Sequence, residues 1–129
     1  MMNTVSAKGN TMERINALLL TSMKEILNQE RHNDNRINLY DVGEYWVAFE
    51  KSAYQLEKLA KDDHEAIVLY IKNHPFPLIM QSIHHKRVND ICYNHIMAKK
   101  SLEYLQLVVH PIDNAFYDKW YRDHIVLCV

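Results

Sequence analysis

The sequence predicts an α/β domain with one mixed β-sheet of about five or six strands and helices packed on it. The chain has 129 residues, of which 48% are hydrophobic, enough to form one core but too few for two domains. Short runs rich in β-branched and aromatic residues alternate with segments in which apolar residues recur every three or four positions. This alternation predicts the order helix, hairpin, helix, two strands, helix, strand, helix.

An amphipathic helix is expected near the N-terminus. Residues 1–10 are mostly small and polar, so they are expected to form a flexible tail before a module over residues 11–129. Asn10 and Glu13 have capping-box spacing, and apolar residues then recur at helical steps as far as about Glu30. The sequence therefore predicts a helix from Asn10 to about Glu30.

The central prediction is a β-hairpin over Ile37–Phe49. Two strand-like runs meet at residues 41–44, where Gly43 suits a turn position with positive φ. Ser52 is expected to cap the following helix, and Gln55 to bond back to the cap in a capping box. That helix is expected to run to about Lys61.

The second half of the chain predicts three further strands. The first covers residues 66–71, and the second begins only after Pro77, because proline cannot donate a ladder hydrogen bond. The third covers residues 102–109. A helix is expected between the last two strands, roughly from His85 to Ala98.

A final helix is expected from Asn114, with Asp113 as its cap. The last five residues, 125–129, are apolar, and their pattern leaves a helix end or an extra strand equally open.

The net charge of the chain excludes the class of strongly basic nucleic-acid-binding proteins. Fifteen basic and sixteen acidic side chains leave a net charge of −1, so any DNA contact must be local. The largest local excess lies at residues 84–100, which carry +3 and leave −4 for the rest of the chain. Lys86 and Arg87, at the start of the predicted helix, are candidate phosphate contacts. The alternative is an ordinary solvated helix face.

The two cysteines, Cys92 and Cys128, lie far apart without a wider cysteine framework, which favours reduced thiols in the cytoplasm. Cys92 is expected to be a small core residue. No secretory signal peptide and no apolar run of about 20 residues is visible, so no membrane association is expected.

No catalytic, metal or cofactor site is predicted. The eight histidines form no His-Glu-x-x-His motif, and no Cys-x-x-Cys motif occurs. Asp62, Asp63, His64 and Glu65 are acid/base candidates by residue type only. Two glycines cannot build a glycine-rich phosphate loop. These absences favour a non-enzymatic protein over a small hydrolase or nuclease.

The hairpin also resembles the N-terminal, mismatch-contacting domain of the MutS DNA mismatch-repair family. The family signature is Gly-Asp-Phe-Tyr-Glu-Leu-Phe, followed by an acidic pair, an alanine and an amphipathic helix. The corresponding residues here are Gly43-Glu44-Tyr45-Trp46-Val47-Ala48-Phe49 and Glu50-Lys51-Ser52-Ala53. The resemblance covers about residues 12–112, but only residues 39–56 are specific. It implies a domain I-like fold without the ATPase of full-length MutS proteins.

The resemblance implies a DNA-contacting role for Tyr45, which occupies the position of the phenylalanine that wedges beside a mispaired base. The base-reading glutamate corresponds to Val47, which can neither donate nor accept a hydrogen bond. The resemblance therefore implies a stand-alone module that contacts double-stranded DNA without family-type mismatch reading. In the alternative, Tyr45, Val47 and Phe49 are core residues of a strand covered on both sides.

A protein-interaction or scaffold module on the same fold is the second hypothesis. It would use the Tyr45–Val47 surface and the aromatic C-terminal helix against a partner protein or a second copy, forming a homodimer. The valine at the base-reading position and the lack of net positive charge favour this hypothesis.

Overall fold

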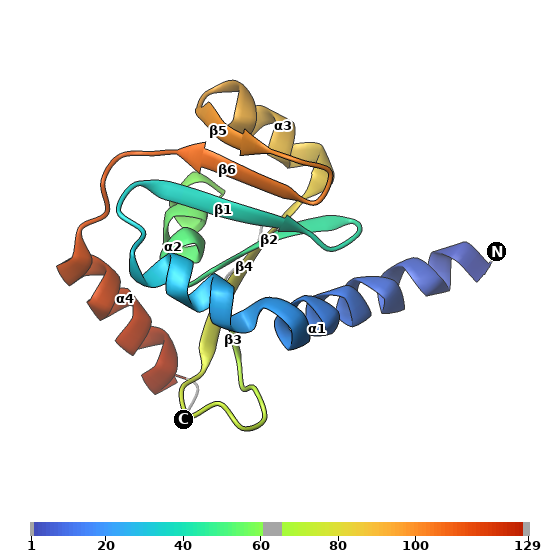
Figure 1. Cartoon of the computed structure of the whole chain (residues 1–129), viewed down its shortest axis with the longest axis horizontal. Coiled ribbons are helices and arrows are strands. Elements are labelled where there is room, and N and C mark those ends of the chain that lie inside the picture. Colours follow the sequence, from blue (N-terminus) through green and yellow to red (C-terminus); the bar gives the residue numbers. More distant parts are fainter. Residues whose placement is uncertain (1, 61–65, 128–129) are drawn as a thin grey trace.

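Six strands form one antiparallel sheet in the order β3-β4-β2-β1-β6-β5, as the computed structural model of the chain shows (Figure 1). The structure describes the backbone of residues 2–60 and 66–127 and the side chains of residues 11–60 and 66–125. The strands are β1 (Arg36–Asp41), β2 (Tyr45–Phe49), β3 (Ile67–Leu69), β4 (Leu78–His84), β5 (Ile96–Lys100) and β6 (Tyr104–Val108). The helices are α1 (Met2–Arg31), α2 (Glu50–Leu59), α3 (His85–Tyr93) and α4 (Asn114–Leu127). The predicted α/β class with five or six strands is confirmed, and all neighbouring strands run antiparallel.

Helices cover both faces of the sheet. On one face, α1 packs against alternate residues of β2 and β4 and forms a core cluster of Ile15, Leu19, Ile26, Val42, Val47, Phe49, Leu78 and Met80. On the other face, α2 and α3 pack against the intervening positions, which include Ile37, Leu39, Trp46, Ala48 and Ile83. α4 lies beside α2 (Figure 1). Strand β2 is thus buried on both sides, as its apolar residues at successive positions predict.

The hairpin is confirmed. β1 and β2 are antiparallel neighbours with Tyr40 opposite Val47. Gly43 has a φ of +111°, and its amide donates to Asp41 Oδ1 over 2.9 Å. A Cβ at this position would lie 2.9 Å from Thr11 Oγ1, so the turn requires glycine for both conformation and space.

The predicted capping role of Ser52 is wrong. Helix α2 begins earlier, at Glu50, and its N-cap residue Phe49 makes no side-chain cap bond. Ser52 instead lies in the first turn, where its amide donates to Glu30 Oε1 over 2.8 Å and its hydroxyl to Glu30 Oε2 over 2.6 Å. A carboxylate from α1 therefore caps α2, and no local sequence pattern contains that contact.

Glu30 accepts two further hydrogen bonds, from Asn33 Nδ2 at 3.1 Å and Asn38 Nδ2 at 2.9 Å. Burial raises the pKa of this carboxyl, and the hydrogen bonds from Ser52, Asn38 and Asn33 oppose that shift. The network joins the end of α1 to β1 and α2, and thereby positions α1 on the sheet.

Two helix boundaries differ from the prediction. α1 begins at Met2 rather than at Asn10, and its N-terminal half projects beyond the sheet (Figure 1). α3 ends at Tyr93 rather than near Ala98, because residues 96–100 form strand β5 and pair with β6. This edge strand has a register shift between Met97 and Lys99. The shift disrupts the alternation of inward and outward side chains by which a strand is recognised in a sequence.

Other boundaries agree with the sequence. β4 begins at Leu78, directly after Pro77. Asp113 Oδ1 accepts hydrogen bonds from the amides of Ala115 and Phe116, at 3.0 and 3.1 Å, and so caps α4 as predicted. The helix continues through Leu127, which settles the open question for residues 125–127, whereas 128–129 lie outside the described residues. None of the described helices combines the length and apolarity needed to cross a bilayer.

Candidate functional site

The structure brings the three residues predicted to contact DNA to one corner of the sheet. Tyr45 begins β2 and lies opposite His84, the last residue of β4, and the two rings meet edge to face at 5.3 Å. His84 Nδ1 accepts a hydrogen bond from the Lys86 amide over 3.1 Å and caps α3. Lys86 and Arg87 therefore lie near Tyr45 in space, although they come about forty residues later in the chain.

This corner is not strongly basic. Lys86 is exposed, and Arg87 Nε lies 3.9 Å from an Asp90 oxygen. Asp41 and Glu44 belong to the same corner, because β1 ends at Asp41 and the Glu44 carbonyl accepts the amide of His85, the first residue of α3, over 3.0 Å. Carboxylates thus balance the basic side chains, and the corner provides no concentrated positive potential.

His85 has both ring nitrogens engaged. The Trp46 indole N–H donates to His85 Nδ1 over 3.1 Å, so the ring proton must lie on Nε2. That nitrogen is 3.3 Å from Asp41 Oδ1 and donates to it. With its only lone pair held by the indole, this imidazole has no free acceptor for proton abstraction.

The face of the hairpin that would meet a base is covered. Val47 is fully buried beneath α1, and Tyr45 is half-buried against the same core cluster. Helix α1 lies over this face (Figure 1). Tyr117 and Trp120 of α4 are also engaged, since they pack edge to face against Tyr54 of α2, at 5.8 and 5.3 Å, whereas Phe116 is exposed. Neither surface named by the sequence is an open apolar face.

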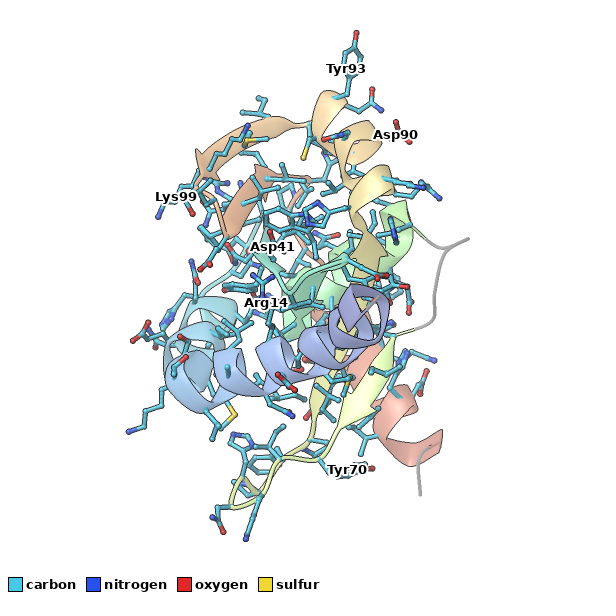
Figure 2. The ribbon with its side chains drawn as sticks, turned by 90° about the vertical axis from the view of Figure 1, so that its right-hand side faces the viewer. Arg14, Asp41, Tyr70, Asp90, Tyr93 and Lys99 are labelled. Carbon is cyan, nitrogen blue, oxygen red and sulfur yellow. The ribbon has the colours of Figure 1, made fainter. Side chains whose placement is uncertain are left out.

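An apolar groove lies elsewhere, between the middle of α1 and the segment after β3. It has a volume of about 480 Å³ and is lined by Asn16, Leu19, Leu20, Met23, Tyr70, Ile71 and Lys72. We call it the α1–β3 groove. Leu19 is a buried core residue there, whereas Leu20 and Tyr70 are 87% and 65% exposed. Figure 2 shows Tyr70 below α1, at the end of the molecule opposite Tyr93.

A second cavity, of about 430 Å³, lies between the start of α2 and α4. Its lining residues are Glu50, Tyr117, Asp118, Tyr121 and Arg122, and we call it the Glu50 pocket. Glu50 has a positive φ of 52°, which is rare for a residue other than glycine and is found preferentially at functional sites. Burial raises the pKa of its carboxyl to about 7, the Ile79 amide opposes the shift, and Glu30 adds to it.

Neither cavity is evident in the sequence. Leu20 and Tyr70 look like ordinary apolar residues of a helix and a strand, and only the exposed fractions distinguish them. The positive φ of Glu50 has no local signal either, because glycine or asparagine would be the expected residue. Among the described residues, no three His, Cys, Asp or Glu side chains are placed to hold a metal ion. The acid/base candidates at residues 62–65 lie outside the described residues.

A scan against protein-family models finds no matching family, and comparisons with curated proteins and with solved structures find no match either. The functional conclusion therefore rests on the geometry of the chain itself.

Proposed function

We propose that the chain is a non-enzymatic, cytoplasmic protein-interaction module that binds an apolar segment of a partner protein in the α1–β3 groove. The observation that supports this most directly is the exposure of Leu20 and Tyr70, at 87% and 65%, around a groove of about 480 Å³. Contiguous exposed apolar surface beside a concave feature is typical of an interaction site.

Two further apolar side chains are exposed on the elements that border the groove. Ile67, at the start of edge strand β3, is 49% exposed, and Met12 on α1 is 57% exposed. Among the described strands, β3 pairs only with β4, so a partner strand can add to its other edge. Lys72 at the groove favours a partner segment that combines an apolar anchor with an acidic neighbour.

Site-specific photocrosslinking in living cells tests this proposal. A photoreactive phenylalanine replaces Tyr70 in the groove, and in a control chain it replaces Tyr93, an aromatic residue that is 90% exposed at the opposite end (Figure 2). We expect one discrete adduct from position 70 and none from position 93. An adduct of twice the chain's mass identifies a second copy, and any other mass identifies a different protein.

A matched pair of variants locates the contact. Leu20→Asp, introduced beside the crosslinker at position 70, should abolish the adduct, because a carboxylate in the groove repels an apolar anchor. Leu102→Asp places the same charge on a leucine that is 93% exposed outside the groove and should leave the adduct intact. If both variants act equally, or if position 93 gives the same adduct, the groove is not the binding site.

The specific observation that favours a second function is the meeting of Tyr45, Lys86 and Arg87 at one corner. In this proposal, which follows the MutS resemblance, the corner contacts double-stranded DNA without reading mismatches, because Val47 replaces the base-reading glutamate. The balance of charges at the corner and the burial of Val47 favour the protein-interaction module instead.

Titration of matched and mispaired duplexes at low salt separates the two functions. DNA binding predicts that Tyr45→Ala and the double change Lys86→Ala with Arg87→Ala each weaken binding, and that the double change lowers the salt dependence. The control is the double change Lys99→Ala with Lys100→Ala, which removes the same charge from the exposed edge strand β5. If neither duplex binds below about millimolar concentration, the DNA function is excluded.

A further inference from the structure

We propose that the Glu50 pocket binds an organic cation, an alkylammonium or guanidinium group, between the Glu50 carboxylate and the rings of Tyr117 and Tyr121. This site is separate from the α1–β3 groove and does not depend on the function proposed above. Four features of the structure support it.

The first feature is that capping does not account for Glu50. Glu30 already provides the carboxylate for the first turn of α2, through the amide and hydroxyl of Ser52. Glu50 lies at the same helix end, but its Oε2 accepts the amide of Ile79 in β4 at 3.2 Å. Glu50 also lines the pocket.

The second feature is the backbone at this position. A left-handed conformation at a residue with a side chain costs about 1–2 kcal/mol, so glycine would be the more stable choice. The chain instead carries an acidic side chain there, in the lining of a cavity. Strain of this kind typically holds a functional group in place.

The third feature is that no cation in the described part of the chain compensates Glu50. Its carboxyl is influenced by burial, by the Ile79 amide and by the negative charge of Glu30, and no Lys or Arg among the described residues offsets them. Arg122 and Asp118 lie on the exposed rim of the pocket, and their opposite charges balance. A desolvated carboxylate without a counterion gains most from a cation that enters the cavity.

The fourth feature is the aromatic wall. Tyr117 and Tyr121 lie with ring centroids 6.3 Å apart, and the Tyr121 hydroxyl donates to the Pro77 carbonyl over 2.7 Å, which fixes that ring. Tyrosine rings attract ammonium and guanidinium groups through their electron-rich faces. The chain's own lysines show this beside the pocket, since Lys58 Nζ lies 4.2 Å from the Tyr54 ring centre and Lys51 Nζ lies 5.9 Å from that of Tyr117.

The size of the cavity defines the ligand class. A volume of about 430 Å³ admits one small molecule or one long side chain. The cation can therefore be a free amine or guanidine, or a Lys or Arg side chain of another protein. Both share the chemistry of a charged nitrogen group on a short apolar stem.

Binding of n-butylammonium and n-butylguanidinium, followed by NMR, tests the site, with neutral n-butanol as the shape control. A ligand that requires ionised Glu50 should bind about tenfold more weakly at pH 6 than at pH 8, because the pKa of this carboxyl is about 7. The groups that face Glu50 are Tyr117, Asp118, Tyr121 and Arg122 from α4, Glu30 from α1 and Lys51 beside it on α2. Burial also raises the pKa of the Glu30 carboxyl, so Glu50→Gln identifies the part of the pH dependence that belongs to Glu50.

Variants assign the binding to Glu50. Glu50→Gln keeps an acceptor for the Ile79 amide but removes the charge, so cation affinity should fall at least about tenfold and lose its pH dependence. Asp123→Asn, at an exposed carboxylate on α4 outside the pocket, should bind like the wild type. Should Glu50→Gln not fold, the wild-type Glu50 pKa decides, since a bound cation must lower it and n-butanol must not.

Three results would overturn the proposal: equal binding by Glu50→Gln, equal binding of n-butanol, or cation binding only after Arg122→Gln. The last result would show that Arg122 is itself the counterion of Glu50. Comparison with a blocked tripeptide that carries arginine or lysine distinguishes the sources. Tighter binding of the peptide indicates a protein side chain, and tighter binding of the free cation indicates a small molecule.

Discussion

At the residue scale, Gly43 carries the tightest steric requirement in the hairpin. Its φ is +111°, and an added Cβ would lie 2.9 Å from Thr11 Oγ1 on α1. We expect Gly43→Ala to lower the free energy of unfolding by about 2–3 kcal/mol, because backbone strain and overpacking add. Urea denaturation measures this. Asn73→Ala is the control, because Asn73 also has a positive φ, of 67°, but is exposed. This variant should lower the free energy of unfolding by about 1 kcal/mol. Equal losses would mean that contact with α1 contributes nothing.

Glu50 makes stability depend on pH. The pKa of its carboxyl rises from an ordinary 4.5 to about 7 on folding, so the folded chain retains a proton that the unfolded chain has lost in this interval. Stability should therefore fall as the pH rises from about 4.5 to 7, by roughly 1–3 kcal/mol from this group.

Urea denaturation at pH 5 and pH 8 checks this prediction. Glu50→Gln should reduce the decrease and be more stable than the wild type at pH 8. Glu44→Gln, at an exposed turn position, is the control and should retain the wild-type dependence. A wild-type chain whose stability is constant between pH 5 and pH 8 would contradict the raised pKa.

Residue chemistry explains why some side chains could be predicted and others could not. Gly43 has a local signal, because a lone glycine between two strand-like runs indicates a turn. Glu30 and Glu50 have none, because the burial of a carboxylate depends on partners that are distant in sequence. Glu30 meets Ser52 twenty-two positions later, and Glu50 meets Ile79 twenty-nine positions later.

At the element scale, the junction of α1, β1 and α2 depends on Glu30. The Glu30 carboxylate accepts four hydrogen bonds, two from Ser52 and one each from Asn33 and Asn38. In Glu30→Gln, an amide nitrogen replaces one acceptor and faces donors. We expect a loss of about 2–4 kcal/mol in the free energy of unfolding.

The control for this prediction is Glu25→Gln on the exposed side of the same helix, which should change stability by less than about 0.5 kcal/mol. Thermal and urea denaturation of both variants provide the measurement. A loss in Glu30→Gln no larger than that of the control would show that the network does not hold α1 in place.

Element boundaries could be predicted where a residue acts locally. Pro77 sets the start of β4, and Asp113 sets the start of α4, because each works through its own backbone or its nearest amides. β5 was missed because Ile96 continues the helical spacing of Val88, Ile91 and Cys92. Its strand conformation depends on pairing with β6, a tertiary contact that overrides the local pattern.

At the scale of the whole molecule, the sheet order separates a protected centre from two exposed edges. β1 and β2 are hydrogen-bonded on both sides and covered by helices on both faces. The edges are β3, with three residues, and β5, most of whose side chains are exposed. The sequence predicted the central hairpin and five of the six strands, but not β5 and not which strands form the edges. Strand order is decided by long-range pairing, and the same apolar pattern is compatible with several strand orders.

This arrangement predicts a gradient of amide hydrogen exchange. Amides of β1 and β2 should exchange only through global unfolding, because opening them disrupts both core clusters. Amides of β3 and β5 should exchange through local openings of much lower free energy, since each of these strands has one neighbour within the described sheet. Native-state exchange followed by NMR in low concentrations of urea separates the two classes, because only global unfolding depends strongly on denaturant. If β5 were as protected as β1, the edge of the sheet would have to be covered in solution. The most direct explanation would then be a partner strand on β5 rather than an anchor in the α1–β3 groove, and removal of that partner by dilution should restore fast exchange.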